Sequence, residues 1–219
     1  MVRAAGLLVV ALALLGCDEK NDGSTIPRDR SNAVTASPEP AGASAAPTAK
    51  AKAAAPRKQL CAGATQRPAP KQSPRAVAAE GASAPPVPVP FGVGKWVWVN
   101  LWAAWCAPCK EEMPRVLAWQ KRLAERGVSI DVAWVSLDDD ERQLDRFLSQ
   151  QPKDAVRASY WLPEGDVRAA FTRELGLKAS PELPVQALVA PSGQTSCVIE
   201  GAVEDSDWPA LATFLGAKP

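Results

Sequence analysis

Two cysteines separated by two residues carry the clearest chemistry in this sequence. Cys106 and Cys109 follow an apolar stretch, residues 98–105, and stand at the start of a helical pattern. Thiols at this spacing can close a small disulfide ring. The free N–H groups and partial positive charge of a helix N-terminus favour the thiolate of the first cysteine. Because a thiolate is the attacking species in thiol–disulfide exchange, the spacing predicts a redox-active pair.

The start of the chain has the features of an export signal. Arg3 precedes an apolar run, residues 4–15, which is too short to span a bilayer and is typical of a signal peptide. The run ends in Leu14-Leu15-Gly16-Cys17, which resembles the lipobox of bacterial lipoproteins. We therefore expect residues 1–16 to be removed and Cys17 to be lipidated. The alternatives are an ordinary signal peptide, or a short anchor with an accidental cysteine.

The residue after Cys17 bears on the choice of membrane. Asp18 resembles the signal that retains lipoproteins of enteric bacteria in the inner membrane. The N-terminal features together predict a lipid-anchored protein of the bacterial cell envelope. It would face the periplasm, from the inner rather than the outer membrane.

Cysteine counting leaves one further pair. The chain has five cysteines, and with Cys17 lipidated and Cys106 and Cys109 paired, Cys61 and Cys197 remain. An exported compartment permits stable disulfides, so we expect a structural disulfide between them. The alternative is two unrelated free thiols, one in a linker and one in a strand.

Composition divides the mature chain into a tether and a domain. Half of the residues between Ser31 and Pro90 are Ala or Pro, and large apolar residues are nearly absent there. Such a segment buries too little surface to offset its ordering entropy, so residues 17–90 are predicted to be a mostly disordered tether. All eight tryptophans lie in residues 91–219, which suffice for one domain with its own core. Neither part has the basic patch that nucleic-acid binding needs.

Strand and helix patterns alternate through the domain. Strands are predicted at residues 95–102, 128–137 and 156–162, and helices at 106–126, 139–151, 166–175 and 205–215; residues 185–190 and 196–201 form a hairpin. This order predicts an α/β fold with a central mixed sheet flanked by helices. The acidic run 138–141 is interpreted as a solvated helix start rather than a metal site. Pro114 should kink its helix, because proline removes one backbone hydrogen bond.

Two stretches of the domain carry a resemblance to a known family. Residues 99–114, VNLWAAWCAPCKEEMP, and residues 183–193, LPVQALVAPSG, resemble the thioredoxin fold and, within it, the membrane-anchored TlpA/ResA-like thiol–disulfide oxidoreductases. The strand and helix between residues 128 and 151 are similar to the insertion of this branch. The family has a β-hairpin ahead of its first core strand. In this chain that region is rich in proline and is expected to be shortened or rebuilt around Cys61.

The resemblance implies roles for the residues around the cysteines. Cys106 would be the attacking thiol, exposed at the helix start, and Cys109 the less accessible resolving thiol. Trp105 would flank and shield the thiols. Pro108 and its neighbour Ala107 would hold the turn between the cysteines and influence the redox potential.

Two further residues are implied in the site. Pro184 would be the cis proline that faces the disulfide, with Pro181 as the competing candidate. Glu112 would tune or shuttle protons near Cys109, unless it is simply a surface residue of the helix. Asn100 stands where many thioredoxins have a buried acid.

The resulting hypothesis is a thiol–disulfide oxidoreductase that reduces disulfides of exported proteins. It would cycle between a dithiol and a disulfide at Cys106 and Cys109, take electrons from a membrane donor protein, and need no cofactor or metal. The alternative is a redox-dependent binding or structural lipoprotein with a static disulfide. A copper chaperone of this fold needs a histidine ligand, and the chain has no histidine. No peroxidase motif is evident, and the loop before Pro184 lacks the Gly-x-x-Gly-x-Pro-Glu pattern of dedicated cytochrome c maturation proteins.

Overall fold

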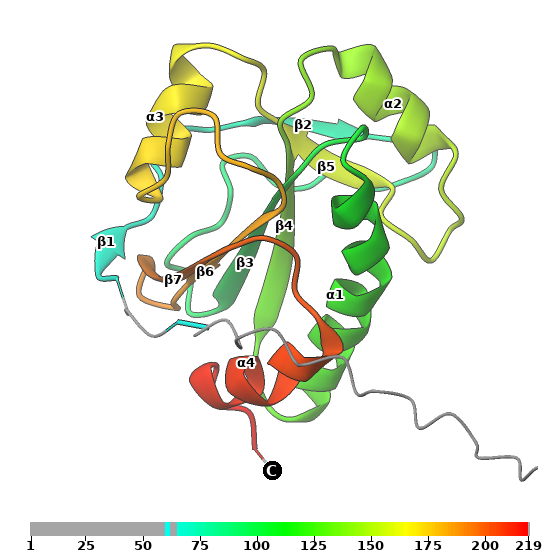
Figure 1. Cartoon of the computed structure of the whole chain (residues 1–219). Coiled ribbons are helices and arrows are strands. Elements are labelled where there is room, and N and C mark those ends of the chain that lie inside the picture. The colour runs from blue at the N-terminus through cyan, green and yellow to red at the C-terminus, as the bar shows by residue number, and fades with distance from the viewer. Residues whose placement is uncertain (1–59, 62–64, 219) are drawn as a thin grey trace, which may run out of the picture. The chain divides into compact units, whose positions relative to one another are not determined.

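The computed structural model describes residues 60–61 and 65–218 (Figure 1). In this part of the chain one mixed sheet has the strand order β1-β7-β6-β3-β4-β5-β2. The strands are β1 (Arg67–Pro68), β2 (Arg75–Ala78), β3 (Trp96–Trp102), β4 (Ile130–Ser136), β5 (Ala158–Trp161), β6 (Val185–Val189) and β7 (Gln194–Glu200). The helices are α1 (Ala107–Glu125), α2 (Glu141–Ser149), α3 (Asp166–Glu174) and α4 (Trp208–Phe214), with a 3-10 turn η1 (Asp205–Asp207) before α4.

Strand β3 lies at the centre of the sheet. It runs parallel to β4 and antiparallel to β6. Its sequence, WVWVNLW, is apolar on both sides, as expected for a strand whose two faces are both covered. The side chains alternate between the faces. Trp98 and Trp102 pack in one apolar cluster with residues of α1, α2 and α4, whereas Val97, Val99 and Leu101 pack in a second cluster with residues of α3.

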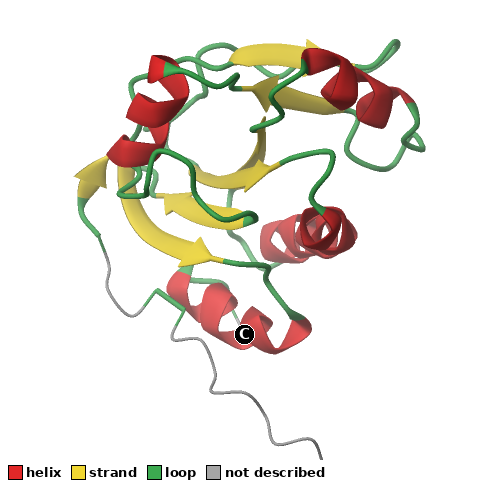
Figure 2. Cartoon of the chain, turned by 45° about the horizontal axis from the view of Figure 1, so that its top comes forward, coloured by secondary structure: helices red, strands yellow, loops and turns green. Residues whose placement is uncertain are grey.

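Helices therefore cover both faces of the sheet. Figure 2 shows α3 separated from α1 and α4 by the strands. The predicted thioredoxin-like fold is confirmed, and each strand and helix expected from residue 95 onward is present. The bounds differ by a few residues at most, for example 107–125 for α1 against the predicted 106–126.

The structure differs from the predicted limit of the tether. Residues 65–90, assigned to the tether, contribute the edge strands β1 and β2. Strand β2 pairs with β5 and β1 pairs with β7, both antiparallel. These strands attach chiefly through backbone hydrogen bonds. They contain few buried apolar side chains, such as Val77. The composition of this segment therefore did not predict that it is ordered.

None of the helices in the described residues combines the length and hydrophobicity that a bilayer-spanning helix requires. Cys17 and the predicted signal peptide lie outside the described residues.

Candidate active site

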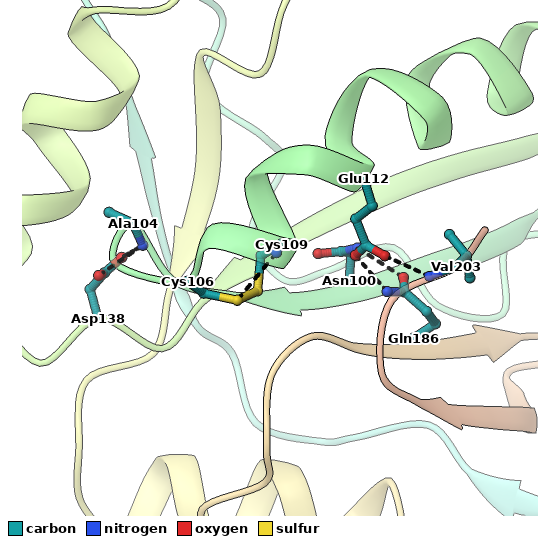
Figure 3. Close-up of a disulfide and its surroundings, with 8 residues drawn as sticks. All are labelled: Asn100, Ala104, Cys106, Cys109, Glu112, Asp138, Gln186 and Val203. Atoms are coloured by element: carbon teal, nitrogen blue, oxygen red, sulfur yellow. Dashed lines mark hydrogen bonds between the residues drawn. A yellow bond between two sulfur atoms is a disulfide. The ribbon is translucent and has the colours of Figure 1, made fainter. Parts of the chain in front are cut away.

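The two cysteines lie where β3 leads into α1. Cys106 is the N-cap of α1, and its Sγ accepts a hydrogen bond from the backbone N–H of Cys109 at 3.3 Å. Pro108 lies in the first turn, where its missing N–H has no helical partner to lose. The sulfur atoms of Cys106 and Cys109 are joined in a disulfide (Figure 3). The pair therefore stands at the positive end of the helix dipole.

The accessibility of the pair differs from the prediction. Cys106 was expected to be exposed, but the residue is only 4% exposed and Cys109 is fully buried. The Cys106 sulfur both accepts the hydrogen bond that caps the helix and bonds the Cys109 sulfur. Trp105 is 61% exposed beside it. The order of accessibility, with Cys106 above Cys109, is the one that an attacking and a resolving thiol require.

Glu112 is buried and follows Cys109 by three positions in α1. Its Oε1 accepts hydrogen bonds from Asn100 Nδ2 and Gln186 Nε2, both at 2.7 Å, and its Oε2 accepts one from the Val203 N–H at 2.8 Å. The alternative interpretation as a surface residue is therefore wrong. Figure 3 shows Asn100 lying between Cys109 and Glu112.

Gln186 is a site residue that the sequence analysis missed. The Trp98 indole N–H is a donor only, and it binds Gln186 Oε1 at 2.7 Å, so the amide N–H group of Gln186 is left to face Glu112. Asn100 Nδ2 also donates to Gln186 Oε1, at 2.8 Å. The available signal in the sequence was a lone glutamine within an apolar strand, two positions after Pro184.

The electrostatics of Glu112 reflect two opposed effects. Burial raises the pKa of its carboxyl group from 4.5, while the three hydrogen bonds and the positive charge of Arg115 act to lower it. Burial is the larger effect, so the side chain binds a proton more tightly than a solvated glutamate. A group of this kind can exchange a proton at a higher pH than an exposed carboxylate.

A hollow of about 630 Å³ lies beside this group. It is lined by Pro108, Glu111, Glu112, Arg115 and residues 202–206. Arg115 closes one wall, where it binds Asp205 Oδ1 at 2.7 Å and the Val203 carbonyl at 2.9 Å. Solvent in this hollow therefore reaches the first turns of α1.

The sequence analysis placed Asp138 wrongly. The run 138–141 was interpreted as a solvated helix start. That is right for Asp140, which caps α2, but wrong for Asp138, which is fully buried. Burial raises the pKa of Asp138, opposed chiefly by hydrogen bonds from Ser136 and Ala104. It is buried because β3 and β4 are parallel, so that their carboxyl ends meet and Asp138 faces the loop before Cys106.

Pro184 directly precedes β6, and the register pairs Val185 with Leu101 near the end of β3. The peptide bond between Leu183 and Pro184 is cis, whereas the bond before Pro181 is not among the cis bonds of the described residues. Pro181 instead lines a hollow that it shares with Trp105 and Leu183.

The other two cysteines in the described residues form a second disulfide. Cys61 and Cys197 are joined in a disulfide, with Cys197 fully buried in β7. Within residues 60–61 and 65–218 there is no group of three His, Cys, Asp or Glu side chains that could hold a metal ion.

Comparison with known proteins adds to this geometry. Residues 91–200 match the Redoxin family. The thiol-disulfide oxidoreductase ResA of Oceanobacillus iheyensis is 31% identical over 113 residues, which cover 50% of this chain and 52% of that protein. ResA of Bacillus anthracis is 39% identical over 51 residues, which cover 23% of this chain and 27% of that protein. These matches confirm the predicted resemblance to the TlpA/ResA-like proteins, although the chain spans only about half the length of the Oceanobacillus relative.

Solved structures with a similar fold include a putative thiol:disulfide interchange protein DsbE from Chlorobium tepidum. It is 21% identical, with a TM-score of 0.49, and the match covers 68% of this chain and 94% of that one. A thioredoxin-related protein from Neisseria meningitidis is 24% identical, with a TM-score of 0.48, and the match covers 64% and 97% of the two chains.

Proposed function

The chain belongs to the Redoxin family, and from that premise we propose that it is a thiol–disulfide oxidoreductase whose working pair is Cys106 and Cys109. The observation that carries the proposal is the disulfide across the first turn of α1, with the Cys106 sulfur at the helix N-cap. A helix N-terminus stabilises a thiolate on the residue that caps it. The exposed indole of Trp105 beside the pair offers a contact surface for a substrate chain.

We propose that the pair acts as a reductant of disulfides in exported proteins. The Cys106 thiolate attacks one sulfur of a substrate disulfide, and the other substrate sulfur leaves as a thiolate that takes up a proton. The Cys109 thiol then loses its proton and attacks the Cys106 sulfur. This second step closes the Cys106–Cys109 disulfide and releases the reduced substrate, so two electrons pass from the protein to the substrate.

Glu112 is proposed to assist the second step. Its carboxyl group lies one helical turn beyond Cys109, and its raised pKa suits it to exchange a proton with the resolving thiol. We further propose that Pro184 borders the site where the substrate chain lies in an extended conformation beside the disulfide, because the next residue, Val185, pairs with Leu101 near the end of β3.

The cycle needs a source of electrons, because it leaves the pair oxidised. We propose a dithiol protein of the membrane as the donor and a lipid anchor at Cys17 as the device that keeps the domain near it. The lipobox-like sequence ending at Cys17 supports the anchor. The periplasmic side of the bacterial inner membrane is the proposed location.

Trapping of mixed disulfides tests the chemistry. The purified full chain in detergent micelles should catalyse insulin reduction by dithiothreitol, and Cys106→Ser should abolish this activity. Cys109→Ser should accumulate a covalent complex between Cys106 and the substrate that reductant dissolves. Equal trapping by both single variants would contradict the assigned order of the thiols.

The reduction potential tests the direction. A value near that of thioredoxin, about −270 mV, would support a reductant, whereas a value near about −120 mV would indicate an oxidant. Equilibration of the full chain with glutathione buffers, followed by acid quenching and thiol alkylation, gives this number directly.

A further inference from the structure

Asp138 makes a set of contacts that links the end of β4 to the loop carrying the redox pair. Its two carboxylate oxygens each lie 3.0 Å from the Ala104 backbone nitrogen, whose N–H they share. Its Oδ2 also accepts a hydrogen bond from the Ser136 hydroxyl at 2.7 Å. Figure 3 shows this contact on the opposite side of the disulfide from Glu112. The carboxylate is therefore separate from the Glu112 network.

The backbone of Asp138 is held from two other elements. Its carbonyl oxygen accepts hydrogen bonds from the Trp161 indole N–H at 2.8 Å and from Arg168 Nη2 at 3.3 Å. Its own N–H donates to the Ser136 hydroxyl oxygen at 3.1 Å. Arg168 is itself tied to the Leu162 carbonyl at 2.8 Å. The backbone of Asp138 is thus held by residues of β4, β5 and α3, and its carboxylate extends from this fixed point.

Ala104 lies in the turn that delivers Cys106 to the helix. Cys106 N–H donates to the Ala103 carbonyl at 3.0 Å, so residues 103–106 form one tight unit. This unit contains the exposed Trp105, which lines two hollows of the surface. An anchor on Ala104 N–H therefore sets where both the Trp105 ring and the Cys106 sulfur lie relative to the sheet.

We propose that Asp138 is a positioning residue for the redox pair, which holds the Trp105–Cys106 turn in its reactive place through the Ala104 N–H. The inference rests on the proposed function of Cys106 and goes beyond it by assigning a group that does not touch the substrate. Both groups that contact the carboxylate oxygens are donors, so the site matches a carboxylate acceptor. A hydrogen bond between an ionised acceptor and a backbone N–H is about twice as strong as a neutral one.

Two variants separate positioning from charge. Asp138→Ala removes every acceptor from Ala104, whereas Asp138→Asn keeps one acceptor oxygen and lets the new amide donate to the Ser136 oxygen. If the contact positions the turn, Asp138→Ala should lower the rate constant for reaction of reduced Cys106 with insulin by about tenfold. Asp138→Asn should recover most of that loss. Asp145→Ala, at an exposed position of α2, is the matched control and should leave the rate unchanged.

The amide resonance of Ala104 gives a readout that does not depend on activity. In the full chain in detergent micelles, it should shift upfield in Asp138→Ala and return toward its wild-type position in Asp138→Asn. The proposal is overturned if Asp138→Ala keeps the wild-type rate, if Asp138→Asn is as slow as Asp138→Ala, or if the Ala104 resonance does not move. A wild-type chain that reduces no disulfide would instead refute the proposed function, while the Ala104 resonance would still test the contact.

Discussion

At the scale of single residues, Cys109 and Glu112 stand three positions apart and so share one side of α1. Every neighbour that contacts the Glu112 carboxyl group through a hydrogen bond is a donor: Asn100, Gln186 and the Val203 N–H. These contacts complement the ionised form. Burial opposes them, and the balance leaves the pKa raised. The pKa of this side chain is thus set by interactions of opposite sign, of which burial is the larger.

Glu112→Gln should change how stability depends on pH. The pKa of Glu112 is higher in the folded protein than its usual 4.5, so above about pH 4.5 the folded state keeps a proton that the unfolded state loses. This contribution to the free energy of unfolding is fully present below pH 4.5 and is lost as the pH rises through the folded pKa. It amounts to about 1.4 kcal/mol for each pKa unit of the shift.

Urea unfolding between pH 4 and pH 8 measures this effect. The free energy of unfolding should fall less steeply with pH in Glu112→Gln than in the wild type. Glu111→Gln, at the exposed neighbouring position, serves as the control and should retain the wild-type slope. If the free energy of unfolding changes with pH in the same way in wild type and Glu112→Gln, the buried carboxyl group is not the cause of the pH dependence.

At the scale of elements, α1 runs without interruption from Ala107 to Glu125, although Pro114 lies inside it. Proline has no N–H, so the helix lacks one backbone hydrogen bond at that turn. The side chain of Pro114 is exposed, whereas Met113 and Val116 face the core. Packing of this buried stripe against the sheet offsets the missing bond.

Pro114→Ala should therefore stabilise the domain. It restores a backbone donor and creates no cavity, because the ring does not contribute to the core. We expect an increase of about 1–3 kcal/mol in the free energy of unfolding, measured by chemical denaturation. A loss of stability would mean that the proline ring fits a bend that alanine cannot maintain. Insulin reduction measured alongside would show whether that geometry also serves the cysteines.

The edge strands form although they bury few apolar side chains. Strand β2 has the sequence RAVA, and only Val77 is buried in it. It is held by pairing with β5 and by an ion pair between Arg75 and Glu141 of α2. A strand that adds to an existing sheet edge pairs through backbone N–H and C=O groups, which nearly every residue has. Its side chains therefore need not show the apolar pattern by which a strand is predicted from sequence.

At the scale of the whole molecule, the second disulfide joins the segment before β1 to the sheet. Cys61 and Cys197 are 136 positions apart, and Cys197 is fully buried opposite Leu188 of β6. A cross-link over so long a loop removes much conformational freedom from the unfolded chain. The chain-entropy treatment assigns about 4–5 kcal/mol to such a loop, and measured values are often smaller.

Cys61→Ser should accordingly lower the free energy of unfolding by about 2–4 kcal/mol without abolishing disulfide exchange. The partly exposed Cys61 is the better site for the change, since it avoids altering the buried position of Cys197. Peptide mapping under graded reductant adds a second measurement, in which Cys106–Cys109 should open first. Finding Cys61 alkylated in the native oxidised protein would contradict the pairing.

The predicted anchor belongs to this scale as well. Cys17→Ser should move the protein from the membrane fraction to the soluble fraction of the cell envelope, because it removes the residue that would be acylated. Mass spectrometry of the mature N-terminus should find lipid on Cys17 in the wild type. Unchanged fractionation, with no acyl group detected, would exclude the lipoprotein interpretation.

The sequence by itself determined the cysteine pair and the central elements. The Cys106–Cys109 spacing is a local feature, and the helix that follows is encoded by the residues next to it. Likewise, the period and length of the apolar runs identify β3, β4 and α1, because each element buries its own side chains.

Only the tertiary structure decided which polar residues are buried around that pair. Gln186 meets Glu112 across 74 positions, and Asp138 meets Ala104 across 34. In the sequence, Gln186 is one amide in an apolar strand and Asp138 is the first of three aspartates. Whether such a side chain is buried and hydrogen-bonded or solvated depends on which elements pack together. That packing follows from the burial of the whole apolar surface rather than from any local pattern.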